Sequence, residues 1–393
     1  MGRRDFPKKK TPPASAEKQN SVRKTQMEGQ VLLMDRIVKI GIIGCGGIAN
    51  GKHMPSLKQI PNVRMVAFCD IKKELAEKAA KDFGAEGAKV YTDYKELLKD
   101  PEIEVVHVLT PNREHADISI DALYAGKHVM CEKPMAKTAA DARRMLEAAE
   151  KTGKKLTIGY QHRHKPQSQD AKKRINAGEL GEIYYANCLA IRRRGTPNWG
   201  VFLDEEAQGG GPIIDIATHS LDLTLYLMNN YEPEMVIGKT HKKLDHPEAG
   251  NIWGDNGVST TTLEEAACAM IRMKNGATIM LETSWALNTC EPVEEGSCVL
   301  CGSKAGLQIK NNNLKINKVE YDRQVVTEVN TSSGGVAFYS GAKVTPALIE
   351  AQSWINAIVN DTDPVVLPKQ ALVVSEILEA IYTSSKTGQP VYF

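Results

Sequence analysis

The stretch IGIIGCGGIA (40–49) decides the fold of this chain. Its glycines fit the pattern G-x-G-x-x-A directly after an apolar strand-like run, a turn whose missing side chains let a pyrophosphate approach backbone N–H groups at a helix N-terminus. A second strand-like run ends in Asp70, whose carboxylate can accept hydrogen bonds from the ribose hydroxyls of a dinucleotide. A carboxylate there would also repel a 2′-phosphate, so the sequence predicts a site for NAD rather than NADP.

Outward from this turn, short apolar runs alternate with amphipathic helical segments as far as residue 160. The runs are nearly continuous in apolar residues, which is typical of parallel strands covered by helices on both faces. One connecting helix is expected to begin with Asn112 as its N-cap and to end at Gly126. These features predict an α/β domain with a doubly wound parallel sheet. Its strands are expected at 37–44, 63–70, 89–93, 104–110, 127–133 and 155–160.

After about residue 165 the strand-like runs become longer and alternate more clearly between apolar and polar residues. They lie at 183–193, 264–273, 277–287 and 297–302, and two helical patterns lie at 213–229 and 345–384. Lys274-Asn275-Gly276 is a hairpin turn signal between two of the runs. We therefore predict a C-terminal α+β domain with a mostly antiparallel sheet. The first domain is placed at residues 35–160, and the second, for substrate binding and oligomerisation, at 161–393.

The composition, with 42% hydrophobic and 25% charged residues among 393, is that of a folded protein of two domains. Residues 1–34 hold eight basic and three acidic residues without apolar periodicity, so a disordered basic tail is expected. The remainder is slightly acidic, which argues against nucleic-acid binding. No run of about 18 apolar residues occurs, so no membrane span is expected. Eight scattered cysteines fit a reducing cytoplasm.

A second motif, CEKP (131–134), ends the fifth predicted strand at the carboxyl edge of the sheet, where doubly wound folds bind their ligands. With the glycine turn and Asp70, this Glu-Lys-Pro resembles the Gfo/Idh/MocA family of sugar and cyclitol dehydrogenases, and the resemblance covers nearly all of residues 37–393. It implies a Rossmann domain that binds NAD, with Lys133 between nicotinamide and substrate. It also implies a cis peptide bond before Pro134, and a hydrogen bond from the nicotinamide ribose to Glu132.

A third motif, GGGPIIDIATHSLD (209–222), places Asp215, His219 and Asp222 at i, i+4 and i+7 on one face of a helix. The spacing resembles the family signature GGG-x-x-x-D-x-x-x-H, in which the aspartate and histidine reach the reacting carbinol. A hydride leaves carbon only as the hydroxyl proton is removed, so a neutral histidine or lysine is needed as the base. We expect Lys133 and His219 to share the proton transfer, and Asp215 to orient and polarise the reacting carbinol.

Two further segments are expected to line the site. YQHR (160–163) ends the sixth strand and resembles the family segment that contacts cofactor and substrate, while RRRGTPNWG (192–200) offers guanidinium donors beside an indole. The predicted cofactor contacts are Gly44, Gly46, Gly47, Ile48, Asp70, Thr110, Asn112, His115, Glu132, Lys133, Gln161 and Arg163. The predicted substrate contacts are Lys133, Tyr160, His162, Arg193, Trp199, Asp215 and His219.

The predicted function is the NAD-dependent oxidation of a ring secondary hydroxyl of a small sugar or glycoside, at C3, to a keto sugar. Resemblance to the family implies a homo-oligomer, a dimer or tetramer. Three alternatives stay open: a myo-inositol-type cyclitol dehydrogenase, a redox-neutral NAD-dependent glycosidase or epimerase, and a non-catalytic NAD sensor. No metal site is predicted, since the Cys298/Cys301 pair has no second pair to complete a tetrahedral zinc site.

Overall fold

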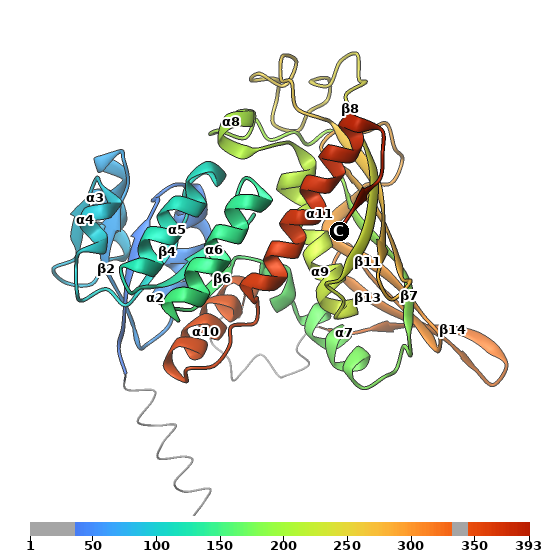
Figure 1. The fold of residues 1–393 in the computed structure, drawn as a ribbon, viewed down its shortest axis with the longest axis horizontal. Helices are drawn as coiled ribbons and strands as arrows, with labels where there is room; N and C mark the ends of the chain where they lie inside the picture. Colours follow the sequence, from blue (N-terminus) through green and yellow to red (C-terminus); the bar gives the residue numbers. More distant parts are fainter. Residues whose placement is uncertain (1–35, 332–344) are drawn as a thin grey trace, which may run out of the picture.

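The computed structural model describes residues 36–331 and 345–393, so the tail predicted at residues 1–34 lies outside the described residues. Two β-sheets organise the chain, one of six strands and one of nine (Figure 1). Within the described ranges, no helix is long and apolar enough to cross a membrane.

The first sheet is parallel throughout, in the order β3-β2-β1-β4-β5-β6. This is the predicted doubly wound Rossmann arrangement, and each of its strands ends within two residues of the expected position. The strands are β1 (Val38–Ile43), β2 (Val63–Cys69), β3 (Lys89–Tyr91), β4 (Val105–Val108), β5 (His128–Cys131) and β6 (Leu156–Ile158). The helical segments are η1 (Ala49–His53), α2 (Met54–Lys58), α3 (Lys73–Phe83), α4 (Tyr94–Leu98), η2 (Asn112–Glu114), α5 (His115–Tyr124) and α6 (Ala139–Thr152).

Both faces of this sheet are covered, which explains its continuous apolar strands. Alternate residues of β4 enter different hydrophobic clusters: Val106 packs with residues of α5 and α6, and Val105 with residues of α2. The second cluster also contains Trp354 and Ile355 of α10 (Pro346–Val359), so a C-terminal helix closes one face of the N-terminal sheet. Asn112 does not cap the helix as predicted, because it is the first residue of the 3₁₀ turn η2 that precedes α5, and its side-chain amide donates to the carbonyl of Gln208.

The second sheet has the order β14-β13-β12-β11-β7-β10-β9-β8-β15. Among the described strands only the β7/β10 pair is parallel, so the predicted, mostly antiparallel sheet is confirmed. Strands β8 and β12 to β15 were not anticipated. Of these, β14 exposes most of its residues, so its sequence lacks the apolar face that marks a strand. The strands are β7 (Ile183–Ile191), β8 (Pro233–His241), β9 (Ala266–Met273), β10 (Thr278–Ser284), β11 (Val293–Gly302), β12 (Ala305–Lys310), β13 (Asn313–Glu320), β14 (Arg323–Val329) and β15 (Val391–Tyr392).

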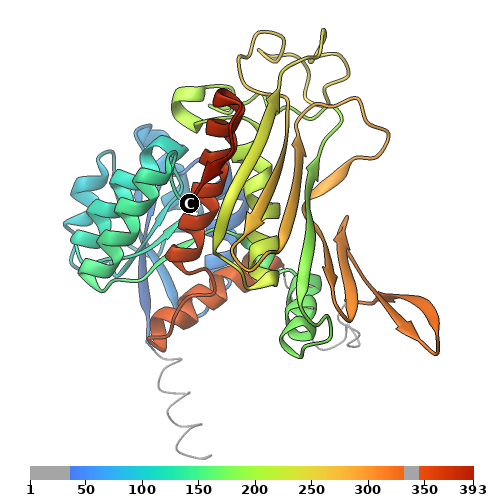
Figure 2. The same cartoon turned by 45° about the vertical axis from the view of Figure 1, so that its right-hand side comes forward.

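Helices α9 (Thr218–Met228) and α11 (Pro368–Thr387) cover one face of this sheet (Figure 2). Helix α11 also contacts α6, so it lies between the two sheets (Figure 1). One hydrophobic cluster contains residues of both sheets, among them Val106 and Ile279, which fixes the two domains against each other. The remaining segments are η3 (Gln161–His164), α7 (Pro166–Asn176), α8 (Glu205–Gln208) and the π-helical turn η4 (Ile213–Ala217), which runs directly into α9.

Candidate active site

The glycine turn after β1 leaves its backbone open. Gly44 has φ +89°, and a Cβ there would lie 2.6 Å from the carbonyl oxygen of Leu109, so only glycine fits. Among the described residues, no atom lies within 4 Å of a Cβ built at Gly46 or Gly47. Asp70, at the end of β2, accepts a hydrogen bond of 2.9 Å from the backbone N–H of Cys45. The carboxylate of Asp70, predicted to bind the ribose of a dinucleotide, is therefore hydrogen-bonded to the predicted turn.

A cavity of about 350 Å³ begins at this turn and extends to the second domain. The Rossmann domain contributes, among others, Ile48, Thr110 and Asn112 to its wall. The Thr110 hydroxyl is buried and has no partner among the described residues, which fits a wall built for a polar ligand. The residues present therefore fit the nicotinamide half of a dinucleotide.

Glu132, at the end of β5, is held by two buried basic side chains, Lys52 and His53. Its Oε1 lies 2.7 Å from Lys52 Nζ and 2.8 Å from His53 Nε2, and Lys52 also pairs with Glu350 of α10 at 2.9 Å. Burial alone would raise the pKa of Glu132, but the attraction of Lys52 and the hydrogen bond to His53 hold that pKa well below its ordinary value. Glu132 is thus ionised and fixed beside the cavity as a hydrogen-bond acceptor.

Lys133 and Asp215 meet across the domain boundary. The peptide bond between Lys133 and Pro134 is cis, as the family resemblance implied. Lys133 Nζ lies 2.8 Å from the carbonyl oxygen of Asp215 and 3.1 Å from its Oδ1, while Trp285 Nε1 donates to Oδ2 at 2.9 Å. Burial would raise the pKa of Asp215, but Lys133 and then Arg192 hold it below its ordinary value. The carboxylate is therefore ionised and held at both oxygens.

His219 lies one helical turn beyond Asp215 and is 5% exposed. Its Nδ1 is buried and has no hydrogen-bond partner in the described part of the chain. Its ring stands 4.8 Å from the ring of His162 and 6.5 Å from that of Tyr160, measured between centroids. Burial first, and the charge of Lys133 second, hold the pKa of His219 well below its ordinary value. The imidazole is therefore neutral at pH 7 and offers a lone pair.

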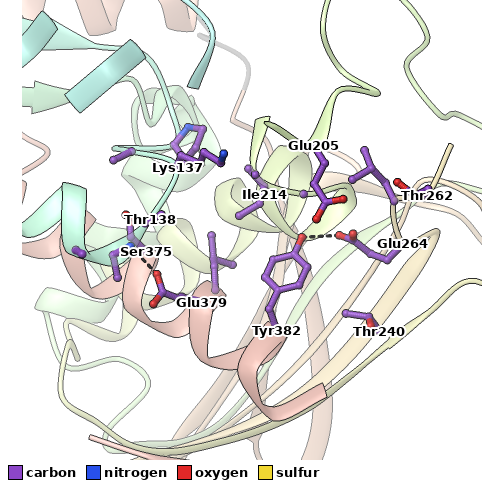
Figure 3. A pocket seen from close by; sticks show the side chains of 18 of the residues that line it. Lys137, Thr138, Glu205, Ile214, Thr240, Thr262, Glu264, Ser375, Glu379 and Tyr382 are labelled. Atoms are coloured by element: carbon purple, nitrogen blue, oxygen red, sulfur yellow. Dashed lines mark hydrogen bonds between the residues drawn. The ribbon is translucent and has the colours of Figure 1, made fainter. Parts of the chain in front are cut away.

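The glycine-rich turn before η4 lies against two half-buried side chains, Glu264 and Tyr382 (Figure 3). Glu264 accepts hydrogen bonds from the backbone N–H of Gly211 at 3.0 and 3.1 Å, and Tyr382 of α11 donates to Glu264 at 2.6 Å. A Cβ at Gly210 would lie 2.0 Å from the Tyr382 hydroxyl oxygen. Gly210 and Gly211 are thus required by packing against Tyr382 and Glu264.

Three predicted contacts have a different role. Arg163 is fully buried, and its guanidinium donates to Asp222, Gln370 and the carbonyl of Val365, so it has no free surface for a cofactor. His115 is equally buried, with its ring nitrogens 2.9 and 2.8 Å from the carbonyl oxygens of Thr110 and Pro134. Tyr160 is 1% exposed and lies behind His219. We therefore correct the prediction for these three residues: their side chains support the walls of the site and do not contact the ligand.

The other predicted residues lie at two cavities. Trp199 lines the same cavity as Lys133, while Gln161, His162 and Arg193 line a neighbouring one. Sequence reasoning missed Lys52, Glu264 and Trp285, whose partners are far away in sequence. Of these three, Trp285 was the easiest to find from the sequence, because it is an aromatic residue within an expected strand.

One cavity is lined by the glycine turn, predicted to bind a dinucleotide, and by the pair of Lys133 and Asp215. The neutral His219 lies next to it. On a doubly wound sheet this combination defines a class, the nicotinamide-dependent dehydrogenases of alcohols.

Comparison with known proteins narrows the class. A profile described as the oxidoreductase family, NAD-binding Rossmann fold, matches residues 38–160, and that of the family's C-terminal alpha/beta domain matches 172–393. D-glucoside 3-dehydrogenase of Escherichia coli K12 is 31% identical over 357 residues, 90% of this chain and 97% of that protein. The chain belongs to the Gfo/Idh/MocA family of oxidoreductases, and it is an NAD-dependent dehydrogenase.

Two other relatives bear on the fold and the substrate. Inositol 2-dehydrogenase of Salmonella typhimurium LT2 is 39% identical over 193 residues, which is 49% of this chain and 55% of that protein. The structure titled levoglucosan dehydrogenase, complex with NADH, superposes with a TM-score of 0.77 at 23% identity, over 91% of this chain and 99% of that chain. The second likeness shows that the fold is shared across both domains.

Proposed function

We propose that this protein oxidises the C3 hydroxyl of a D-glucoside to a ketone, with NAD⁺ as the hydride acceptor. The observation that carries the proposal is similarity to a D-glucoside 3-dehydrogenase over nine-tenths of the chain. The neutral His219 next to the Lys133–Asp215 pair supports it, because alcohol oxidation needs a proton acceptor at the reacting carbon.

When bound on the glycine turn, NAD⁺ provides the hydride acceptor: the hydrogen of C3 leaves with its bonding electron pair. The protein's own residues handle the proton. The imidazole of His219 takes the hydroxyl proton, and the ammonium of Lys133 stabilises the negative charge that develops on the oxygen. Asp215 holds that ammonium in place, and Trp285 and Arg192 in turn fix Asp215. Glu132 offers its carboxylate to a ribose hydroxyl.

The test is a substrate screen. The protein with NAD⁺ is incubated with methyl α- and β-D-glucopyranoside, free glucose and myo-inositol, the NADH absorbance is followed, and the product carbonyl is located by NMR. A 3-keto glucoside supports the proposal. Oxidation of inositol alone would favour a cyclitol dehydrogenase, as the half-length inositol 2-dehydrogenase relative suggests. Release of free sugar with no net ketone would favour a redox-neutral enzyme.

We further infer that the protein works as a homo-oligomer in the cytoplasm. All eight cysteines are free, which suits a reducing compartment. The β13–β14 hairpin exposes apolar side chains, with Val319 66%, Tyr321 98% and Val326 65% accessible. Light scattering after size exclusion tests the assembly, and a monomeric mass at micromolar concentration would contradict it.

A further inference from the structure

A second cavity, of about 870 Å³, adjoins the catalytic residues, and Arg192 is the one residue of its lining that the mechanism above uses. Gln161, His162, Arg192, Arg193 and Trp253 are among the residues that line it. Pockets for small organic ligands measure roughly 300 to 1,000 Å³, so this one can take a ligand of more than one ring.

Two contacts connect this cavity to the reacting groups. Arg192 Nη1 lies 3.7 Å from Oδ2 of Asp215, while the same guanidinium stands 5.7 Å from the ring centroid of Trp253. The ring of His162 lies 4.8 Å from that of His219. A substrate that reacts at His219 can therefore extend along Arg192 towards Trp253 without leaving the protein surface.

The cavity walls carry polar groups that the described protein does not satisfy. His162 is 4% exposed, and both of its ring nitrogens are buried without a hydrogen-bond partner. Burial and the neighbouring lysines lower the pKa of His162 to about 3, so the ring is neutral and can both donate and accept. Within the described chain, the exposed side chain of Arg193 also makes no hydrogen bond. A buried polar group without a partner is costly, so His162 points to a polar ligand, and the exposed guanidinium of Arg193 offers that ligand further hydrogen-bond donors.

Trp253 supplies a flat apolar surface beside these polar groups. Its side chain is 41% exposed and packs edge-on against Trp199, with 4.8 Å between the ring centroids. Trp199 itself lines the cofactor-side cavity, so the two indoles stand between the two cavities. An indole face with adjacent hydrogen-bonding groups suits a sugar ring, which has one apolar C–H face and a rim of hydroxyls.

We propose that this cavity is a subsite for a second neutral sugar ring, so that the preferred substrate is a glucosyl disaccharide. The inference rests on the proposed function. The glucosyl ring is held at Lys133 and His219, and the second ring stacks on Trp253 and bonds to His162 and Arg193. A purely aromatic aglycone is disfavoured, because it would leave His162 and Arg193 unpaired.

The test compares methyl α- and β-D-glucoside with maltose, cellobiose and the 4-nitrophenyl glucosides. We expect at least one disaccharide to have a kcat/KM tenfold or more above that of the methyl glucoside of the same anomer, mainly through KM. Trp253→Ala should reduce kcat/KM for that disaccharide at least tenfold more than for the methyl glucoside, and Trp253→Phe should restore part of the loss. Arg272→Ala, which changes an arginine paired with Glu234 on the second sheet, is the matched surface control and should change neither.

Binding to the NADH complex separates this inference from the proposed function, because no reaction occurs there. A disaccharide that binds more tightly than the methyl glucoside, with the difference lost in Trp253→Ala, supports the subsite. If methyl glucosides are oxidised but disaccharides bind no better, or 4-nitrophenyl glucosides bind better than either, the subsite is wrong and the function stands. If no glucoside is oxidised or bound, the proposed function itself is wrong.

Discussion

Trp285→Phe removes one hydrogen bond from the catalytic carboxylate and keeps an aromatic ring in its place. The indole donates to Asp215 Oδ2 at 2.9 Å, and the side chain is 1% exposed, so water cannot readily replace the lost donor. A hydrogen bond to a charged group contributes about 1.5 to 3 kcal/mol. At about 1.4 kcal/mol for each factor of ten, kcat/KM should fall about 12- to 140-fold. The affinity for NADH should stay unchanged, because Trp285 supports Asp215 and not the glycine turn.

Trp354→Phe provides the matched control. Trp354 is 3% exposed and packs in the cluster on the far face of the first sheet, and its indole nitrogen has no partner in the described residues. Both substitutions therefore remove the same buried volume, but only one removes a hydrogen bond to Asp215. We expect both variants to lose stability to urea, and only Trp285→Phe to lose activity.

The assay combines steady-state kinetics on the best glucoside, urea unfolding and NADH fluorescence titration. A Trp285→Phe enzyme that keeps kcat/KM within threefold of wild type while its stability drops would refute the role assigned to the indole. Equal loss of activity in both variants would show instead that the effect comes from packing.

Three further predictions follow from the site. Asp70→Ala should narrow the preference for NAD over NADP, measured as the ratio of kcat/KM values, and better use of NADP by the unchanged protein would contradict the reasoning. Lys133→Ala and His219→Ala should each lower kcat by about 10² to 10⁴, and the double variant should be far from additive. His162 stays neutral when folded because its pKa is lowered to about 3, yet it gains a proton below about pH 6.5 when unfolded. The unfolding free energy should therefore fall as pH drops from 7 to 4, by up to about 1.4 kcal/mol per pH unit for this group. Urea titrations at several pH values should show that the unfolding free energy of His162→Gln depends less steeply on pH than that of the unchanged protein.

The sequence by itself determined the fold class of both domains, and it pointed to Lys133, Asp215 and His219, which the structure brings together. Continuous apolar runs predicted the strands of the first sheet because a strand covered on both faces has no polar side. The glycine turn and Asp70 were readable because they reflect constraints on a few adjacent residues. The i, i+4 spacing of Asp215 and His219 placed them one turn apart even though the helix begins as a π-helical turn.

Only the tertiary structure decided which partner each charged or polar residue meets. Arg163 follows a strand at the ligand edge, as a cofactor contact would. Its side chain is nevertheless buried, because it forms an ion pair with the buried Asp222. Lys52 joins Glu132 to Glu350 of a helix near the C-terminus, and Trp285 reaches Asp215 from another strand. Such contacts arise from how the elements pack, and no local pattern in the chain encodes distances between segments that are far apart in sequence.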